Sequence, residues 1–198
     1  MTFTAGRPMP DEAWALLQAW LPSNDAPDRP LMTLSTITPA GRPDARAVLL
    51  TEYDEQGLYF HTDSGSAKVA QLAAEPHVAL TLLWPELPRQ LVVRGVAAIA
   101  PPDESAWAYR ARSPYLQQLA WQNTPAFAEL PDSVRREQWA EFAAAHPDGF
   151  EQPDTWFGVV VRPTELTFWT PGVGTASRRL RFTRSADTGG WQSRLLSG

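Results

Sequence analysis

The sequence of 198 residues contains no cysteine, and this absence excludes several kinds of chemistry. Disulfides, thiolate metal sites, iron–sulfur clusters and thiol nucleophiles all need that side chain. With three histidines and no close carboxylate cluster, the chain offers no pattern typical of a catalytic metal site, and no Ser-His-Asp set stands out. The lack of cysteine fits a cytoplasmic protein. We expect a cytoplasmic protein with no metal and no catalytic side-chain nucleophile.

Long apolar runs and an excess of positive charge are also lacking. No stretch approaches the roughly 18 apolar residues of a membrane-spanning helix, and the N-terminal MTFTAGRPMPDEAW lacks the regions of a signal peptide. The formal net charge is −5, whereas a protein that binds nucleic acid through its phosphates normally presents a basic surface. We therefore expect no membrane and no nucleic-acid partner, and a bound anion must be held by a few local cations.

Short segments rich in Thr, Val, Leu and Ile follow one another closely and predict a mainly β protein. Regular alternation with long helices is missing, as are GxGxxG and GxxxxGK[ST], which argues against a dinucleotide-binding or P-loop fold. We predict a closed or nearly closed β-barrel with added helices (α+β), in a single domain over residues 1–198. The expected strands are residues 31–37, 45–53, 58–62, 77–84, 91–99, 157–162, 165–170, 180–184 and 191–196; the expected helices are residues 10–21, 66–74 and a helical insert over about 103–145 that includes 132–145.

Two segments carry residues suited to binding an anion. Arg46 lies in the apolar strand DARAVLL, where its guanidinium must reach either solvent or an anion. The segment HTDSGSAK, residues 61–68, places hydroxyls and Lys68 between a strand and a helix, a combination that suits a phosphate but also caps helices in many proteins. Each segment is therefore a candidate site with an ordinary structural alternative.

Two further positions suit an aromatic ligand. Gln90 opens the strand QLVVRG and can both donate and accept hydrogen bonds at the polar edge of a ring, although a strand-initial Gln commonly faces solvent. Trp169 could cover an aromatic ligand, and Arg178 or Arg179 could add a cation. The alternatives are a core Trp and a solvated Arg pair. The sequence has nine Trp, which indicates flat apolar surfaces in cores, interfaces or ligand pockets.

Taken in order, four segments resemble the pyridoxamine 5'-phosphate oxidase family: LMTLSTITPAGRPDARAVLLTEYDEQGLYFHTDSGSAK, LPRQLVVRGVA, LTFWT and RRLRF. The resemblance covers most of residues 31–98 and, more loosely, the C-terminal third. It implies an FMN-binding split barrel and a homodimer with FMN at the subunit interface. The cofactor-binding residues that it implies are Arg46, Ala47, Val48, Leu49, Thr51, His61, Thr62, Ser66, Lys68, Gln90, Trp169 and Arg179.

The sequence departs from the family pattern where the vitamin substrate would bind. Thr51 stands where the oxidases carry a substrate-phosphate Lys, and Ala67 stands where the family usually has an Arg before the phosphate Lys. Each lost charge-assisted hydrogen bond costs roughly 1.5–3 kcal/mol, so several losses reduce affinity by orders of magnitude. The remaining candidate substrate-binding residues are Arg112, Tyr109 and Ser177.

Three hypotheses follow from this resemblance. The first is an FMN-dependent oxidoreductase that acts on a small molecule other than the vitamin phosphates. The second is a pyridoxamine/pyridoxine 5'-phosphate oxidase with a rewired phosphate pocket. The third is a flavin-binding carrier or sensor without catalysis.

Overall fold

The computed structural model describes residues 9–84 and 86–198, which divide into two compact units. The first unit comprises the described residues up to Phe60, together with Ala70–Ala98 and Val159–Gly198. The second comprises His61–Val69 and Ile99–Gly158. The helical insert expected over residues 103–145 lies within the second unit.

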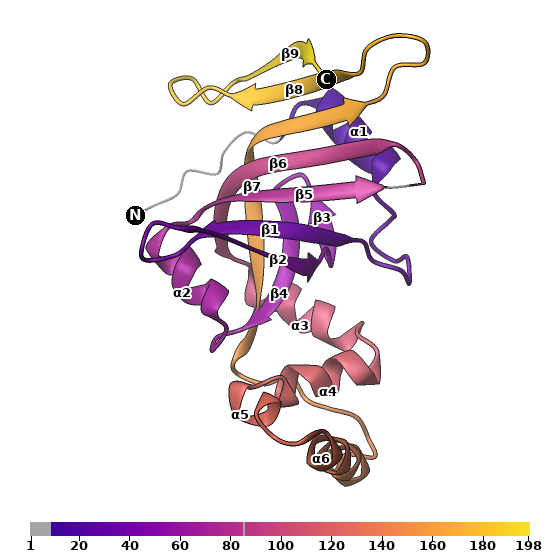
Figure 1. Cartoon of the computed structure of the whole chain (residues 1–198), viewed down its shortest axis with the longest axis vertical. Coiled ribbons are helices and arrows are strands. Elements are labelled where there is room, and N and C mark those ends of the chain that lie inside the picture. Colours follow the sequence, from indigo (N-terminus) through magenta and orange to yellow (C-terminus); the bar gives the residue numbers. More distant parts are fainter. Residues whose placement is uncertain (1–8, 85) are drawn as a thin grey trace. The chain divides into compact units, whose positions relative to one another are not determined.

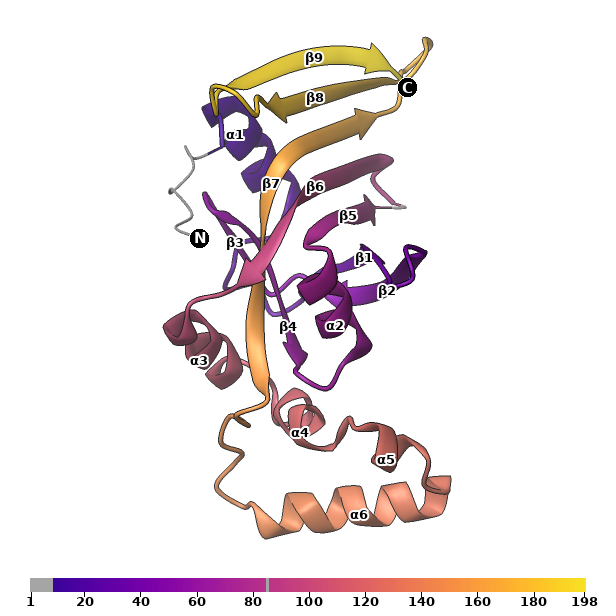
Figure 2. The ribbon, with the colours of Figure 1, turned by 90° about the vertical axis from the view of Figure 1, so that its left-hand side faces the viewer.

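An antiparallel sheet forms the framework, and its strands in the first unit curl into a half-barrel (Figure 1). The order is β2-β1-β5-β6-β7-β4-β3, and β8 pairs with both β7 and β9. Figure 2 shows β8 and β9 as a hairpin beside the end of β7. The predicted β-barrel class with added helices is thus confirmed as a half-barrel. The strands are β1 Leu31–Ile37, β2 Pro43–Leu49, β3 Glu52–Asp54, β4 Gly57–Asp63, β5 His77–Trp84, β6 Arg89–Ile99, β7 Trp156–Thr170, β8 Arg178–Arg184 and β9 Trp191–Ser197.

Period-two alternation supplies the core of the first unit. In β1 the side chains of Met32, Leu34 and Thr36 are buried while their neighbours are exposed or half-buried. Leu80 of β5 pairs with Leu34, and both side chains are fully buried. Because successive side chains of a strand point to opposite faces, one face of this sheet is apolar and enclosed.

The helices follow the predicted segments with one addition. Helix α1, Asp11–Trp20, buries Ala13 and Leu17 in the first unit. The short helix α5, Pro125–Ala128, was not predicted; its start is fixed by Thr124, whose hydroxyl accepts the Phe127 N–H. In the described part of the chain, no helix is long and apolar enough to cross a membrane. The other helices are α2 Ala67–Ala74, α3 Pro102–Arg110, α4 Pro114–Gln122 and α6 Asp132–Ala145.

Two predicted strand boundaries were wrong. The strand expected over residues 45–53 breaks into β2 and β3, because the Leu50 N–H donates to Pro30 O (2.9 Å) and the Thr51 N–H to Tyr59 O (3.0 Å). The two strands expected on either side of Pro163 are one strand, β7. A proline removes only one ladder donor, so a long strand can pass through it where that donor is not needed.

Close backbone contact explains Gly95 in β6. A Cβ atom at this position would overlap the carbonyl oxygen of Arg162 in β7. Gly57 in β4 has the same relation to Val161 O. The middle of β7 is therefore approached by two strands that can lie so close only because glycine has no side chain.

Candidate functional site

A cavity of about 430 Å³ in the second unit brings together five of the predicted site residues. They are His61 and Thr62 from β4, Ser66 and Lys68 at the start of α2, and Arg112 just after α3. The rest of its lining comes from the end of β4, the turn into α2 and its first residue, the segment from α4 to α5, and the first residue of β7: Asp63, Gly65, Ala67, Leu119, Ala120, Asn123, Thr124, Pro125, Ala128 and Trp156.

One wall of this cavity is a polar cradle around Lys68. The Lys68 ammonium donates to the Thr62 hydroxyl (3.1 Å) and to the Ser66 hydroxyl. The Asp63 carboxylate accepts the Gly65 N–H (2.7 Å), which shapes the turn from β4 into α2. A Lys with two hydroxyls at the start of a helix matches the acceptor oxygens and negative charge of a phosphate.

Trp156 provides an aromatic platform in the same cavity. The His61 ring stacks on it with 4.4 Å between ring centroids and 6° between planes. His61 Nε2 lies 3.2 Å from Glu104 Oε1, and the His61 side chain is fully buried. Glu104 and Trp156 were not predicted as site residues, because both are far from His61 in sequence and only tertiary folding brings them to it.

Arg112 is a half-buried cation held against the same ring. Its Cζ lies 5.0 Å from the Trp156 ring centroid, which is within cation–π distance. Its Nε is buried and has no hydrogen-bond partner among the described residues. Burial lowers the pKa of Arg112 below its ordinary value, because the charged form loses solvation. The site therefore contains a cation whose charge is incompletely compensated.

Tyr109, a predicted substrate-binding residue, is buried in the structure. Its ring packs edge-on against Trp156 with 5.1 Å between centroids, and its hydroxyl donates to Gln117 O (3.2 Å). Burial raises the pKa of the Tyr109 phenol. These contacts favour a packing role for Tyr109.

Arg46 of the first unit lies in a hydrogen-bonded network. Its Nη2 donates to Asp44 Oδ2 (2.6 Å) and Gln71 Oε1 (2.7 Å), and its Nη1 donates to Thr36 Oγ1 (2.7 Å) and Leu34 O (3.2 Å). A hydrogen bond from Gln71, with Arg46 adding its charge, lowers the pKa of Asp44. The terminal nitrogens of Arg46 are thus engaged within the chain, which is the structural alternative to anion binding.

The other predicted site residues lie on strands or loops of the first unit. The Thr51 hydroxyl donates to Tyr59 O (3.2 Å), and Trp169 of β7 is paired with Arg179 of β8. Gln90 of β6 is paired with Leu83 of β5. Ala47, Val48 and Leu49 lie in β2, and Ser177 directly precedes β8.

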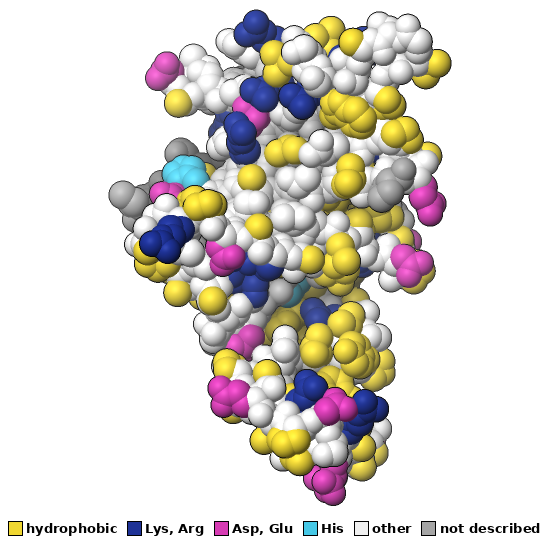
Figure 3. Space-filling model, viewed as in Figure 1, with side chains coloured by type: hydrophobic (Ala, Val, Ile, Leu, Met, Phe, Trp, Pro, Cys, Tyr) yellow, Lys and Arg dark blue, Asp and Glu magenta, His cyan; other side chains and the backbone are white. Residues whose placement is uncertain are grey.

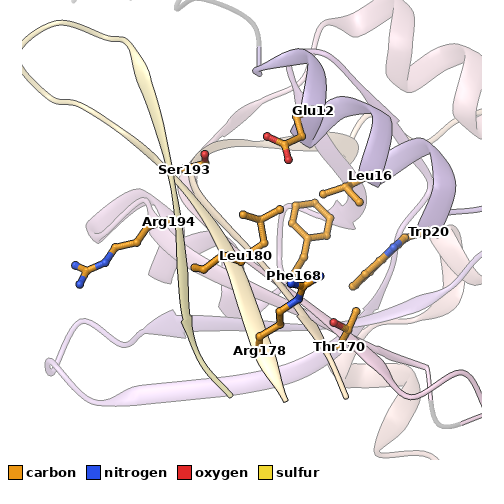
Figure 4. A pocket seen from close by; sticks show the side chains of 10 residues that line it. Glu12, Leu16, Trp20, Phe168, Thr170, Arg178, Leu180, Ser193 and Arg194 are labelled. Carbon is orange, nitrogen blue, oxygen red and sulfur yellow. The ribbon is translucent and has the colours of Figure 1, made fainter. Parts of the chain in front are cut away.

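A second cavity, of about 480 Å³, lies within the first unit between α1, β7, β8 and β9. Figure 4 shows Phe168 and Leu180 side by side on the sheet and Leu16 and Trp20 on the helix, while the Arg194 side chain points away. Arg178, Arg194, Thr170 and Ser193 also line it, but among the described residues no cation there is hydrogen-bonded to two hydroxyls as Lys68 is. The cavity of the second unit is therefore the better candidate for binding a phosphate.

Comparison with known proteins gives a consistent result. Residues 17–143 match the family model described as pyridoxamine 5'-phosphate oxidase. A pyridoxine/pyridoxamine 5'-phosphate oxidase of Salinibacter ruber is 34% identical over 174 residues, which cover 84% of this chain and 78% of that protein. PhzG from Burkholderia lata, solved with tetrahydrophenazine-1-carboxylic acid, has a TM-score of 0.80 at 24% identity, covering 96% of this chain and 94% of that one. An FMN-binding protein related to pyridoxamine 5'-phosphate oxidase, from Nostoc punctiforme, has a TM-score of 0.63 at 20% identity, covering 97% and 100%.

Replacement of the aromatic platform should destabilise the protein. Trp156→Ala removes the packing of His61, Tyr109 and Arg112, and we expect it to lower the free energy of unfolding by about 3–5 kcal/mol. Urea denaturation followed by circular dichroism measures this. Trp107, which is 47% exposed, is the matched control, and Trp107→Ala should have a much smaller effect. Equal losses for the two variants would contradict the platform role.

Proposed function

Because the chain belongs to the pyridoxamine 5'-phosphate oxidase family, we propose that it is an FMN-dependent oxidoreductase acting on a small molecule. The observation that carries the proposal is the cradle of Thr62, Ser66 and Lys68 in the cavity of the second unit. FMN ends in a phosphate, which needs cationic and hydroxyl donors. The cradle supplies both in one cavity.

The donor set fits the phosphate end of FMN. The lining contains two side chains with a permanent positive charge, Lys68 and Arg112, and the hydroxyls of Thr62 and Ser66. When bound, the flavin would supply the redox chemistry, and the protein would supply binding, orientation and exclusion of water. The roles expected for Arg46, Gln90, Trp169 and the other first-unit residues stay predictions.

We further propose that the substrate is not a vitamin B6 phosphate. Thr51 is neutral, and its hydroxyl already donates to Tyr59 O. Tyr109 is 2% exposed and uses its hydroxyl on Gln117 O. These positions therefore offer no cation and no accessible phenol to a substrate phosphate.

The names of relatives support a second candidate function, the pyridoxine/pyridoxamine 5'-phosphate oxidase activity itself. The Salinibacter ruber relative carries that name at 34% identity. We expect the FMN-loaded protein to release at most trace peroxide from pyridoxamine 5'-phosphate, measured by a peroxidase-coupled assay. Peroxide release that matches substrate consumption would overturn the first proposal and establish the second.

We also propose that the protein is a cytoplasmic homodimer. Leu31 of β1 and Leu83 of β5 are 66% and 65% exposed on the outer face of the sheet. Leu49 is paired with Leu31, and Gln90 with Leu83, so both share that face. In Figure 3 the surface over β1, β5 and β6 is largely uncharged. An exposed apolar patch of this kind is typical of an interface, and a second copy would cover it.

FMN binding should depend on Lys68, which is the only lysine of the sequence. We expect Lys68→Ala to weaken FMN binding roughly 10- to 100-fold, because one charge-assisted contact is lost. Visible absorption and flavin fluorescence measure this. With ¹³C-labelled lysine, the single side-chain signal should shift on addition of FMN. Absence of FMN binding by the unmodified protein at micromolar concentration would overturn the proposed function.

The outer face of the sheet should hold the dimer together. We expect light scattering to give the mass of a dimer, and Leu31→Asp/Leu83→Asp to give a folded monomer, because two charges would be buried in the interface. Val173→Asp, at a residue that is 99% exposed outside this face, is the control and should leave the dimer intact. A monomeric unmodified protein, or a doubly substituted protein that stays dimeric, would contradict the interface.

A further inference from the structure

The cavity of the second unit is lined by two permanent cations that come from different elements. Lys68 lies in the first turn of α2, and Arg112 lies just after α3. The position directly before Lys68, Ala67, lines the same cavity and carries no charge. The second positive charge of this cavity therefore comes from the residues that follow α3 and not from the start of α2.

The charge of an FMN phosphate exceeds what Lys68 alone can balance. A phosphate monoester carries about −1.5 to −2 charges at neutral pH. Asp63 also lines the cavity, and its carboxylate adds a negative charge although it accepts the Gly65 N–H. A phosphate held here thus needs a second cation near the cradle, and Arg112 is the other permanent cation among the described lining residues.

The surroundings of Arg112 leave its guanidinium able to bind an anion. No carboxylate forms an ion pair with it among the described residues, and its buried Nε lacks a hydrogen-bond partner. Arg112 Cζ lies over the Trp156 ring, 5.0 Å from its centroid, so the ring compensates part of the charge. A guanidinium positioned in this way can donate two parallel hydrogen bonds to phosphate oxygens.

We propose that Arg112 is the second cation for the phosphate of FMN, and that it serves the cofactor instead of the substrate. This inference rests on the proposed function, since it assumes that FMN binds in this cavity. It implies that Arg112 and position 67 are alternative sources of the same charge. An arginine introduced at position 67 should therefore replace Arg112.

The test compares two flavins that differ only in the phosphate. Dissociation constants for FMN and riboflavin are measured by flavin fluorescence for the unmodified protein, Arg112→Gln, Ala67→Arg/Arg112→Gln and Arg110→Gln. We expect Arg112→Gln to weaken FMN binding roughly 10- to 100-fold and riboflavin binding less than about threefold. Ala67→Arg should restore part of the FMN affinity. Arg110→Gln, a neighbouring exposed arginine outside the cavity, should change neither constant.

The possible outcomes separate this inference from the proposed function. If the unmodified protein binds FMN and Arg112→Gln binds it equally well, Arg112 does not serve the cofactor phosphate. Equal losses for FMN and riboflavin would assign Arg112 to packing against Trp156 and overturn the inference. If Ala67→Arg restores no FMN affinity, the two positions are not exchangeable. A protein that binds neither flavin fails the proposed function itself.

Discussion

The stack of His61 on Trp156 is the interaction on which the candidate site depends. It joins the end of β4 to the start of β7, two strands that are far apart in sequence. Tyr109 and Arg112 from the α3 region pack on the same indole. Because a stacked aromatic pair buries a large apolar area in one geometry, it can fix the position of three segments at once. The cradle around Lys68 begins one residue beyond His61 and so starts from a fixed point.

The individual strands and helices could be predicted from the sequence, whereas the backbone hydrogen bonds between distant segments could not. The bounds of Leu31–Ile37, His77–Trp84 and Asp132–Ala145 agree with the prediction, because alternation or helical spacing decides them within one segment. The break after Leu49 depends on distant backbone partners in Pro30 and Tyr59, which no local pattern reveals. The boundary predicted inside β7 was also wrong, because Pro163 interrupts the sequence pattern of a strand but does not interrupt the strand itself.

The same division applies to the candidate site. The segment from His61 to Lys68 could be singled out because hydroxyls, a turn and a cation occur together between a strand and a helix. Trp156 and Glu104 could not, since each is an ordinary residue until folding brings it to His61. Arg46 shows the reverse situation, in which folding reveals local partners that the sequence did not, while its expected role in FMN binding stays a prediction. An arginine in an apolar strand suggests a ligand, and in the structure Asp44, Gln71 and Thr36 accept hydrogen bonds from its terminal nitrogens.

The net charge of −5 makes the local arrangement of cations decisive. At physiological salt, charges more than about 8 Å apart are largely screened when exposed to solvent, so the acidic surface does little to an anion inside a cavity. Within the cavity, where solvent is partly excluded, one unpaired guanidinium has a larger effect than many surface carboxylates. A protein that is acidic overall can therefore hold a phosphate with one lysine and one arginine, provided that a rigid surface such as the Trp156 ring keeps the arginine in place.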